Sequence, residues 1–139
     1  MVKPTVRVAV VIDTSGSMSG DDLTRAVTEV KGILKAVGVS ESVSVISCDA
    51  AVQTAQKVFN ASQITLGGGG GTDMRVGLSA AIDTKPKPHI VIVLTDGYTP
   101  WPAKAPVGVQ TIVGIIGAYT DENSCPDWAK KIVIDYGDD

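Results

Sequence analysis

The amino-acid sequence predicts a single α/β domain built on a mostly parallel β-sheet. Apolar runs such as Val6–Ile12 and Ile90–Leu94 are typical of strands that are buried on both faces of a parallel sheet. These runs alternate with two amphipathic stretches, Asp21–Val37 and Met74–Ile82, whose apolar residues recur at helical spacing. Alternating strands and helices predict helices packed on a central sheet.

Length and composition fit one soluble domain that spans residues 1–139. A chain of this size buries a core without disulfides or a structural metal. The net charge of -3, with scattered Lys and Arg, argues against a nucleic-acid partner. No apolar run approaches the ~20 residues of a membrane span, and no signal peptide is present, so no membrane contact is expected. Cys48 and Cys125 are expected to be free thiols of a cytoplasmic protein.

A hairpin is predicted in the first half of the chain. Val43–Cys48 and Val52–Phe59 are Val-rich runs joined by Asp49–Ala51, which is too short for a parallel crossover. The two runs are therefore expected to pair antiparallel, with Val52–Phe59 at an edge of the sheet. Asp49 is interpreted as a turn residue.

The second half of the chain predicts fewer helices than such folds usually have. Strands are expected at Val109–Ile116 and Lys131–Tyr136, and one helical turn at Pro126–Lys130. Three prolines between Asp96 and the first of these strands exclude a full crossover helix. Trp101 in that segment is either a core residue that covers the sheet or an exposed interaction anchor.

A loop rich in hydroxyl groups follows the first strand. Asp13, Ser15 and Ser17 stand at alternate positions, and the carboxyl ends of parallel strands are where open α/β sheets bind ligands. One carboxylate and two hydroxyls are hard oxygen donors that suit a small divalent cation. The alternative is a local role, in which these residues cap the following helix and shape the loop.

Two further stretches end at the same predicted edge. Gly67–Gly71 costs much backbone entropy, so it indicates close approach of the backbone to a ligand. A phosphate-binding P-loop is not favoured, because Thr72 and Asp73 follow the glycines where that motif needs Lys and Ser or Thr. The second stretch is the strand Ile90–Leu94, which is followed by Thr95 and then by Asp96 at the same predicted edge. Asp73 is interpreted as a helix N-cap or a support of the loop.

Three motifs occur in a fixed order along the chain: Asp-x-Ser-x-Ser at Asp13, Gly-Gly-Thr-Asp ending at Asp73, and Thr-Asp-Gly around Asp96. Together they resemble the metal-ion-dependent adhesion site (MIDAS) of von Willebrand factor A (vWA) domains. The resemblance covers nearly the whole chain. It is closer still to the A-like domain at the carboxyl end of bacterial proteins classed as metallopeptidases, with matching motifs at Ile12–Met18, Ser47–Ala50, Gly68–Asp73 and Leu94–Tyr98.

This resemblance implies a Rossmann-like, three-layer vWA fold with one antiparallel edge strand and a reduced helix complement. It implies a metal held by the hydroxyls of Ser15, Ser17 and Thr72, with Asp13 and Asp96 binding directly or through water. It also implies that the chain is the excised carboxyl-terminal domain of a longer bacterial protein.

The donor set favours Mg²⁺, or else Mn²⁺ or Ca²⁺, and disfavours Zn²⁺, because it lacks thiolate and imidazole. Neutral hydroxyls leave the ion with spare charge and an exchangeable position. We therefore expect a protein-interaction module, in which an Asp or Glu of a protein partner or a companion domain completes the coordination shell. Tyr98 and Trp101 would supply apolar contact area beside it.

A metal-dependent hydrolase or phosphotransferase is the alternative function. Asp13 could be a phosphotransferase nucleophile, but Ser15 stands where a second acid is expected. His89, the only histidine, begins the strand that ends near Asp96, roughly 20 Å away at ~3.3 Å per residue. No His-Glu-x-x-His motif is present, so any peptidase activity would lie in a segment absent from this chain. The chain itself is expected not to be an enzyme.

Overall fold

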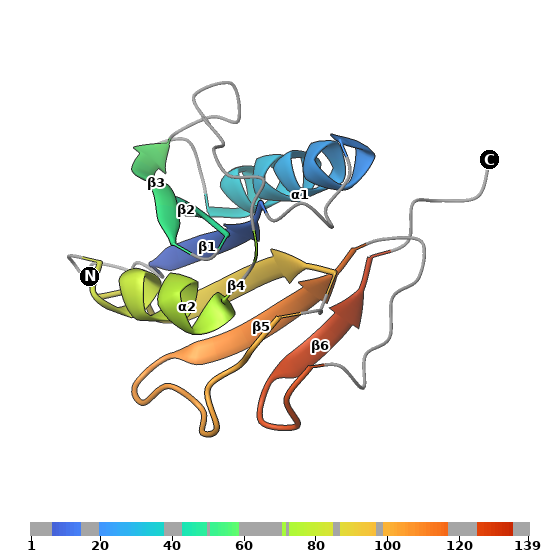
Figure 1. The fold of residues 1–139 in the computed structure, drawn as a ribbon. Coiled ribbons are helices and arrows are strands. Elements are labelled where there is room, and N and C mark those ends of the chain that lie inside the picture. The colour runs from blue at the N-terminus through green and yellow to red at the C-terminus, as the bar shows by residue number, and fades with distance from the viewer. Residues whose placement is uncertain are drawn as a thin grey trace, which may run out of the picture.

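The computed structural model describes residues 7–14, 20–37, 43–49, 51–58, 71, 73–84, 87–96, 99–116 and 125–134. The described elements, in chain order, are β1 (Val8–Asp13), α1 (Gly20–Val37), β2 (Val43–Cys48), β3 (Val52–Val58), α2 (Met74–Ile82), β4 (Ile90–Thr95), β5 (Gln110–Ile115) and β6 (Lys130–Val133). Figure 1 shows them as one twisted sheet with a helix on each side. Each predicted strand and both predicted amphipathic helices are found, with ends that differ by a few residues.

The six strands form one sheet in the order β3-β2-β1-β4-β5-β6. All neighbouring pairs are parallel except β2 and β3, which are antiparallel with an irregularity beside Ser47 and Cys48. The mainly parallel sheet and its antiparallel edge strand are therefore confirmed. The strand order reverses direction at β1, which has β2 on one side and β4 on the other. Such a switch point is the usual ligand-binding crevice of open α/β sheets.

The helices cover opposite faces of the sheet, which gives the three-layer α/β architecture (Figure 1). On one face, Ala26 and Val30 of α1 pack against Val10 and Ile12 of β1. On the other face, buried residues of α2 pack against the inner strands, in a cluster that includes Met74, Leu78, Ala81, Val11, Ile46 and Val93. Strands buried on both faces explain why β1 reads as an unbroken apolar run. None of the helices in the described part of the chain is long and apolar enough to cross a membrane.

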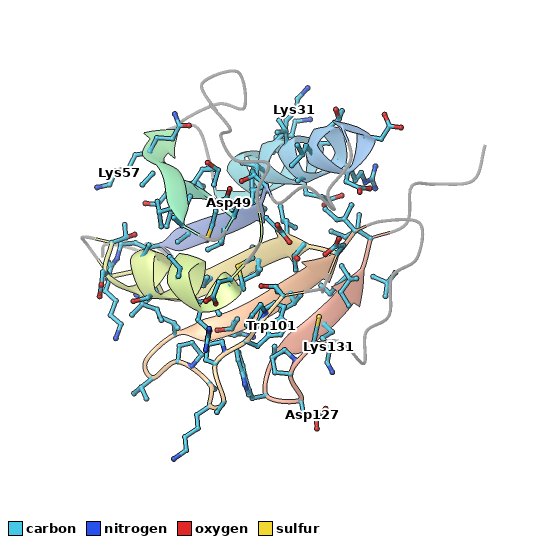
Figure 2. The ribbon with its side chains drawn as sticks, viewed as in Figure 1. Lys31, Asp49, Lys57, Trp101, Asp127 and Lys131 are labelled. Carbon is cyan, nitrogen blue, oxygen red and sulfur yellow. The ribbon has the colours of Figure 1, made fainter. Side chains whose placement is uncertain are left out.

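The proline segment covers the sheet without a helix. Residues 99–109 contain no helix, as the prolines predicted. Trp101 is half-buried and packs against the same core cluster as α2, and Figure 2 shows it against the sheet. Trp128 packs there as well, and its Nε1–H donates to the Pro102 carbonyl at 3.1 Å. The core interpretation of Trp101 is therefore the one that the structure supports.

Residues 126–130 do not form a helix. The Ala129 N–H donates to the Pro126 carbonyl at 3.2 Å, which closes a single turn, and the chain enters β6 directly. β6 ends at Val133, short of the predicted Tyr136, which lies outside the described residues. The predicted helical turn at Pro126–Lys130 is a single hydrogen-bonded turn instead, because β6 begins at Lys130 and leaves no residues for a helix.

Gly77 sets how closely α2 approaches the sheet. A Cβ at this position would lie 2.7 Å from Val11 Cγ1 and 3.2 Å from Cys48 Sγ. Contacts below 3.0 Å do not occur between well-packed carbons, so only glycine allows this separation of helix and sheet.

We predict that Gly77→Ala lowers the free energy of unfolding by about 1–3 kcal/mol, because the added methyl group overpacks the contact with Val11. Gly32→Ala is the matched control in α1. A Cβ at Gly32 meets nothing within 4 Å, so this variant should gain about 0.5–1 kcal/mol from the higher helix propensity of alanine. Urea denaturation of both variants measures the difference. A Gly77→Ala protein as stable as wild type would contradict the packing argument.

Candidate metal site

Two of the predicted ligands lie at neighbouring strand ends. Asp13 is the last residue of β1, and its carboxylate lies within hydrogen-bond distance of Thr95, the last residue of β4. Asp96 follows directly. Asp13 is fully buried and Asp96 is 7% exposed. The switch point of the sheet therefore holds two carboxylates that are almost completely removed from water.

The Asp13 carboxylate is held by a neighbouring strand. Thr95 Oγ1 donates to Asp13 Oδ2 at 2.5 Å, in a fully buried contact. Hydroxyl bonds to a charged acceptor are short and strong, and they fix the orientation of the carboxylate. On its other side, Asp13 pairs in register with Cys48 of β2. Sequence reasoning did not identify Thr95 as a support for Asp13, although the strand-end motif Thr95–Asp96 contains it.

Ser15, Ser17 and Thr72 lie outside the described residues. The described residues next to them are attached to the same edge of the sheet. The Thr14 N–H donates to the Cys48 carbonyl at 2.9 Å, which fixes the chain as it leaves β1. The Asp73 N–H, directly after Thr72, donates to the Asp49 carbonyl at 3.0 Å.

Asp73 and Asp49 have the supporting roles that the sequence predicted. Asp73 is the N-cap of α2, and its Oδ1 accepts from the Arg75 N–H at 3.1 Å. The Arg75 guanidinium also binds both carboxylate oxygens, at 2.9 and 2.8 Å, and this contact holds the pKa of Asp73 below its ordinary value. Asp49 shapes the β2–β3 turn, because its Oδ1 accepts from the Ala51 N–H at 3.1 Å.

A second hydrogen bond joins α2 to the segment after β4. The Met74 N–H at the start of α2 donates to Thr99 Oγ1 at 2.8 Å. The end of the glycine loop is thus bound to the β2–β3 turn through Asp73 and to the post-β4 segment through Met74. Nothing in the local sequence pattern around Thr99 predicted this contact.

Cys48 lies among the carboxylates of this edge. Its thiol donates to the Asp49 carbonyl at 3.2 Å and is fully buried. Burial first, and then the nearby charges of Asp13, Asp49 and Asp73, raise the pKa of Cys48 from 9.0 to about 11. The raised pKa keeps the group a neutral thiol at physiological pH. Cys48 and Cys125 are both buried, and no disulfide joins them.

The donor chemistry of this edge fits a hard cation. Within the described ranges, no group of three His, Cys, Asp or Glu residues is arranged to hold a metal, so a site here needs the predicted hydroxyls beside Asp13 and Asp96. Thr14, next to Asp13, is 4% exposed, and its hydroxyl has no hydrogen-bond partner among the described residues. This hydroxyl is a further oxygen donor at the same edge as Asp13.

The single histidine is remote from this edge. His89 precedes β4, and its Nδ1 accepts from the Arg7 N–H at 2.9 Å, at the amino end of the strands. This contact agrees with the structural role that the sequence predicted for His89.

The raised pKa of Cys48 predicts a loss of stability at high pH. The folded state keeps the thiol proton up to about pH 11, whereas the unfolded chain releases it near pH 9. The contribution of the neutral thiol is therefore complete below pH 9, and it falls by about 1.4 kcal/mol per pH unit as the pH rises toward 11. The stability difference between wild type and Cys48→Ala, measured by urea denaturation, should shrink over this window. A difference that stays constant from pH 8 to pH 11 would show that the thiol is not protected in this way.

Solved structures with this fold are similar to the chain, at low sequence identity. An aerotolerance-related membrane protein from Bacteroides fragilis is 18% identical, with a TM-score of 0.58, over 81% of this chain and 68% of its own. The ArnB paralog VWA2 from Sulfolobus acidocaldarius is 17% identical, with a TM-score of 0.58, over 79% and 34%. Proximal thread matrix protein 1 from the mussel byssus, with a zinc-occupied MIDAS motif, is 17% identical, with a TM-score of 0.65, over 92% and 43%.

The chain thus spans between 34% and 68% of the length of these three structures, and the similarity supports the fold. No curated protein sequence matches the chain at a significant level. A family model does match, over residues 8–135, and it is described as the VWA-like domain (DUF2201). With this match, the sheet order and the fold similarities, the chain belongs to the VWA-like domain family.

Proposed function

We propose that this VWA-like domain is a divalent-metal-binding module that recognises a protein through its metal. Asp13, Ser15, Ser17, Thr72 and Asp96 form the metal site, as in a MIDAS. The observation that carries the proposal is the pair of buried carboxylates, Asp13 and Asp96, at the neighbouring ends of β1 and β4.

The burial of these carboxylates favours a bound cation. Removing a carboxylate from water costs several kcal/mol unless hydrogen bonds or opposite charge compensate for it. The Thr95 hydroxyl supplies one strong hydrogen bond to Asp13. A divalent ion between Asp13 and Asp96 would supply opposite charge, and the three hydroxyls would complete a set of oxygen ligands.

The identity of the ion follows from the same donor set. Oxygen ligands without thiolate or imidazole favour Mg²⁺, Mn²⁺ or Ca²⁺. The zinc in the MIDAS motif of the byssus protein shows that this kind of site also accepts Zn²⁺ in that protein. Zn²⁺ therefore belongs in any metal titration of this domain, although the sequence disfavours it.

The role of the metal is recognition of a carboxylate. An ion held mainly by neutral hydroxyls keeps spare charge and an exchangeable position, which an Asp or Glu of a partner or a companion domain can fill. Trp101 packs against the core, so it contributes less contact area at this edge than the sequence suggested. A bacterial, cytoplasmic parent protein with a metallopeptidase segment remains a proposal, drawn from the resemblance of the motifs.

Hydrolysis or phosphoryl transfer is a weaker candidate. His89 lies at the opposite end of β4 from Asp96, and the Cys48 thiol is held neutral by its raised pKa. The part of the chain that the structure describes therefore places no activated base or nucleophile beside the carboxylates.

We predict that Mg²⁺ or Mn²⁺ raises the melting temperature of the wild-type domain in proportion to the logarithm of ion concentration. At about a hundredfold excess over Kd, the added stability is about 2.7 kcal/mol. Thr72→Ala and Asp96→Asn should lose this gain and keep the fold. Asp83→Asn, an exposed carboxylate on α2, is the matched control and should keep it. If wild type and all three variants showed equal metal-dependent shifts in melting temperature, the site assignment would be wrong.

Metal-dependent recognition is tested with the immobilised domain and lysate from the source cells. We expect one or more proteins to be retained with Mg²⁺, and to be lost with EDTA or with Ser15→Ala. Partners that are retained equally in EDTA would mean that the metal does not mediate recognition. Turnover of p-nitrophenyl phosphate or of a casein substrate by wild type with Mn²⁺, absent in Asp13→Asn, would favour the hydrolase instead.

A further inference from the structure

A hollow of about 540 Å³ lies beside α2, at the start of the edge strand β3. Val52 of β3 forms one wall. The remaining lining residues come from α2 and its two ends, and they are Asp73, Arg75, Val76, Ser79, Ala80 and Asp83. Val76, Ser79, Ala80 and Asp83 recur at the spacing of one helix face. This face is distinct from the one that buries Met74, Gly77, Leu78 and Ala81. α2 thus has one side on the core and another beside the hollow.

β3 offers a backbone edge next to this hollow. It is the terminal strand of the sheet, bound to β2 on one side, and no strand in the described ranges pairs with its other side. An edge strand exposes unpaired N–H and C=O groups, which can bind a further strand. Ala55 and Val52 are exposed along β3, and Lys57 projects from it away from the sheet (Figure 2).

The charges around the hollow select its occupant. Asp73 and Arg75 are joined by two hydrogen bonds and neutralise each other. The Asp83 carboxylate at the end of α2 is exposed and forms no ion pair with the described residues. It therefore gives the hollow a net negative charge. Val52, Val76 and Ala80 supply an apolar wall beside it.

The hollow and the neighbouring edge of β3 together form a groove. We propose that this groove binds an extended peptide segment of a partner protein, which adds to the sheet as a strand alongside β3. One apolar side chain of the peptide enters the hollow against Val52, Val76 and Ala80. A lysine or arginine of the peptide pairs with Asp83. Main-chain hydrogen bonds to an edge strand provide affinity in this mode of recognition, and pockets for alternate side chains provide specificity.

The site is separate from the metal site proposed above and does not require it. Asp73 lines the hollow and directly follows the predicted ligand Thr72 in the sequence. One partner can therefore contact both sites. Because the groove contains no predicted metal ligand, peptide binding should persist in EDTA, and loss of the metal site leaves this inference standing.

The test uses an array of N-acetylated, C-amidated peptides of about eight residues, a typical strand length. Threonine and valine alternate in each peptide, with one central pocket position and one charged position varied. Wild-type domain in EDTA should bind a subset that carries an apolar pocket residue and a lysine or arginine. The amide NMR shifts caused by the best peptide should lie on β3 and α2.

Three variants distinguish the groove from other surfaces. Ser79→Trp fills the hollow from an exposed position and should weaken binding more than tenfold. Thr28→Trp, at an exposed position of α1, is its matched control and should bind like wild type. Asp83→Lys should lose the lysine peptide and gain the corresponding glutamate peptide, because the charge of the rim is reversed.

The other open edge of the sheet is the competing location. Ile132 of β6 is 49% exposed, and Ile132→Lys should leave peptide binding unchanged. Circular dichroism of each variant establishes that the fold is kept. The inference is overturned if no peptide of the array binds at millimolar concentration. It is overturned equally if Ser79→Trp binds like wild type, or if Ile132→Lys abolishes binding.

Discussion

The hydrogen bond from the Thr95 hydroxyl to the buried carboxylate of Asp13 is the contact on which the metal edge depends. It joins the ends of β1 and β4, which are neighbours only because the strand order reverses at β1. A shift of one residue in the β1–β4 register would turn Asp13 toward the opposite face of the sheet. The apolar residues of both strands oppose such a shift, because Val11 and Val93 are buried on one face and Ile12 and Leu94 on the other. The hydrophobic core therefore fixes the orientation of a polar site.

The same edge concentrates negative charge. Burial, and then the charges of Asp13, Asp49 and Asp73, raise the pKa of the Cys48 thiol, which lies near all three carboxylates. Three acids close together would repel one another in a site of low dielectric. Arg75 offsets the charge of Asp73, and Asp49 is used in the β2–β3 turn. Asp13 and Asp96 are the two carboxylates of the vWA-like motifs at this edge, and both are almost completely buried.

Most of the fold could be predicted from the sequence, because its signals are local. Apolar runs indicated β1 and β4, helical periodicity indicated α1, and the short Asp49–Ala51 connection required an antiparallel hairpin. The supports of the site could not be found in this way. Thr95 and Thr99 act through residues far away in sequence, so their roles depend on strand register and on the path of the chain after β4.

The predicted metal ligands also fall into two groups, those whose position the structure describes and those whose position it does not. Asp13 and Asp96 were placed correctly at one edge, because each follows an apolar strand of the parallel sheet. Ser15, Ser17 and Thr72 lie outside the described residues, so their assignment rests on the motifs they share with vWA domains. The hollow beside α2 was not predicted, because the apolar stripe of a helix identifies only the face that it buries.

The attachment of α2 determines how the domain meets a partner. Its amino end is held by the Asp73 bond to Asp49 and by the Met74 bond to Thr99. Its middle lies close to β1 and β2 at Gly77, where the helix carries no side chain and the side chains of Val11 and Cys48 pack against its backbone. These contacts hold α2 on the sheet, so the described residues of the groove are in place without a partner. Binding to a preformed surface avoids the free-energy cost of ordering it. Asp73 at the amino end of α2 lines the peptide groove and directly follows Thr72 of the proposed metal site in the sequence.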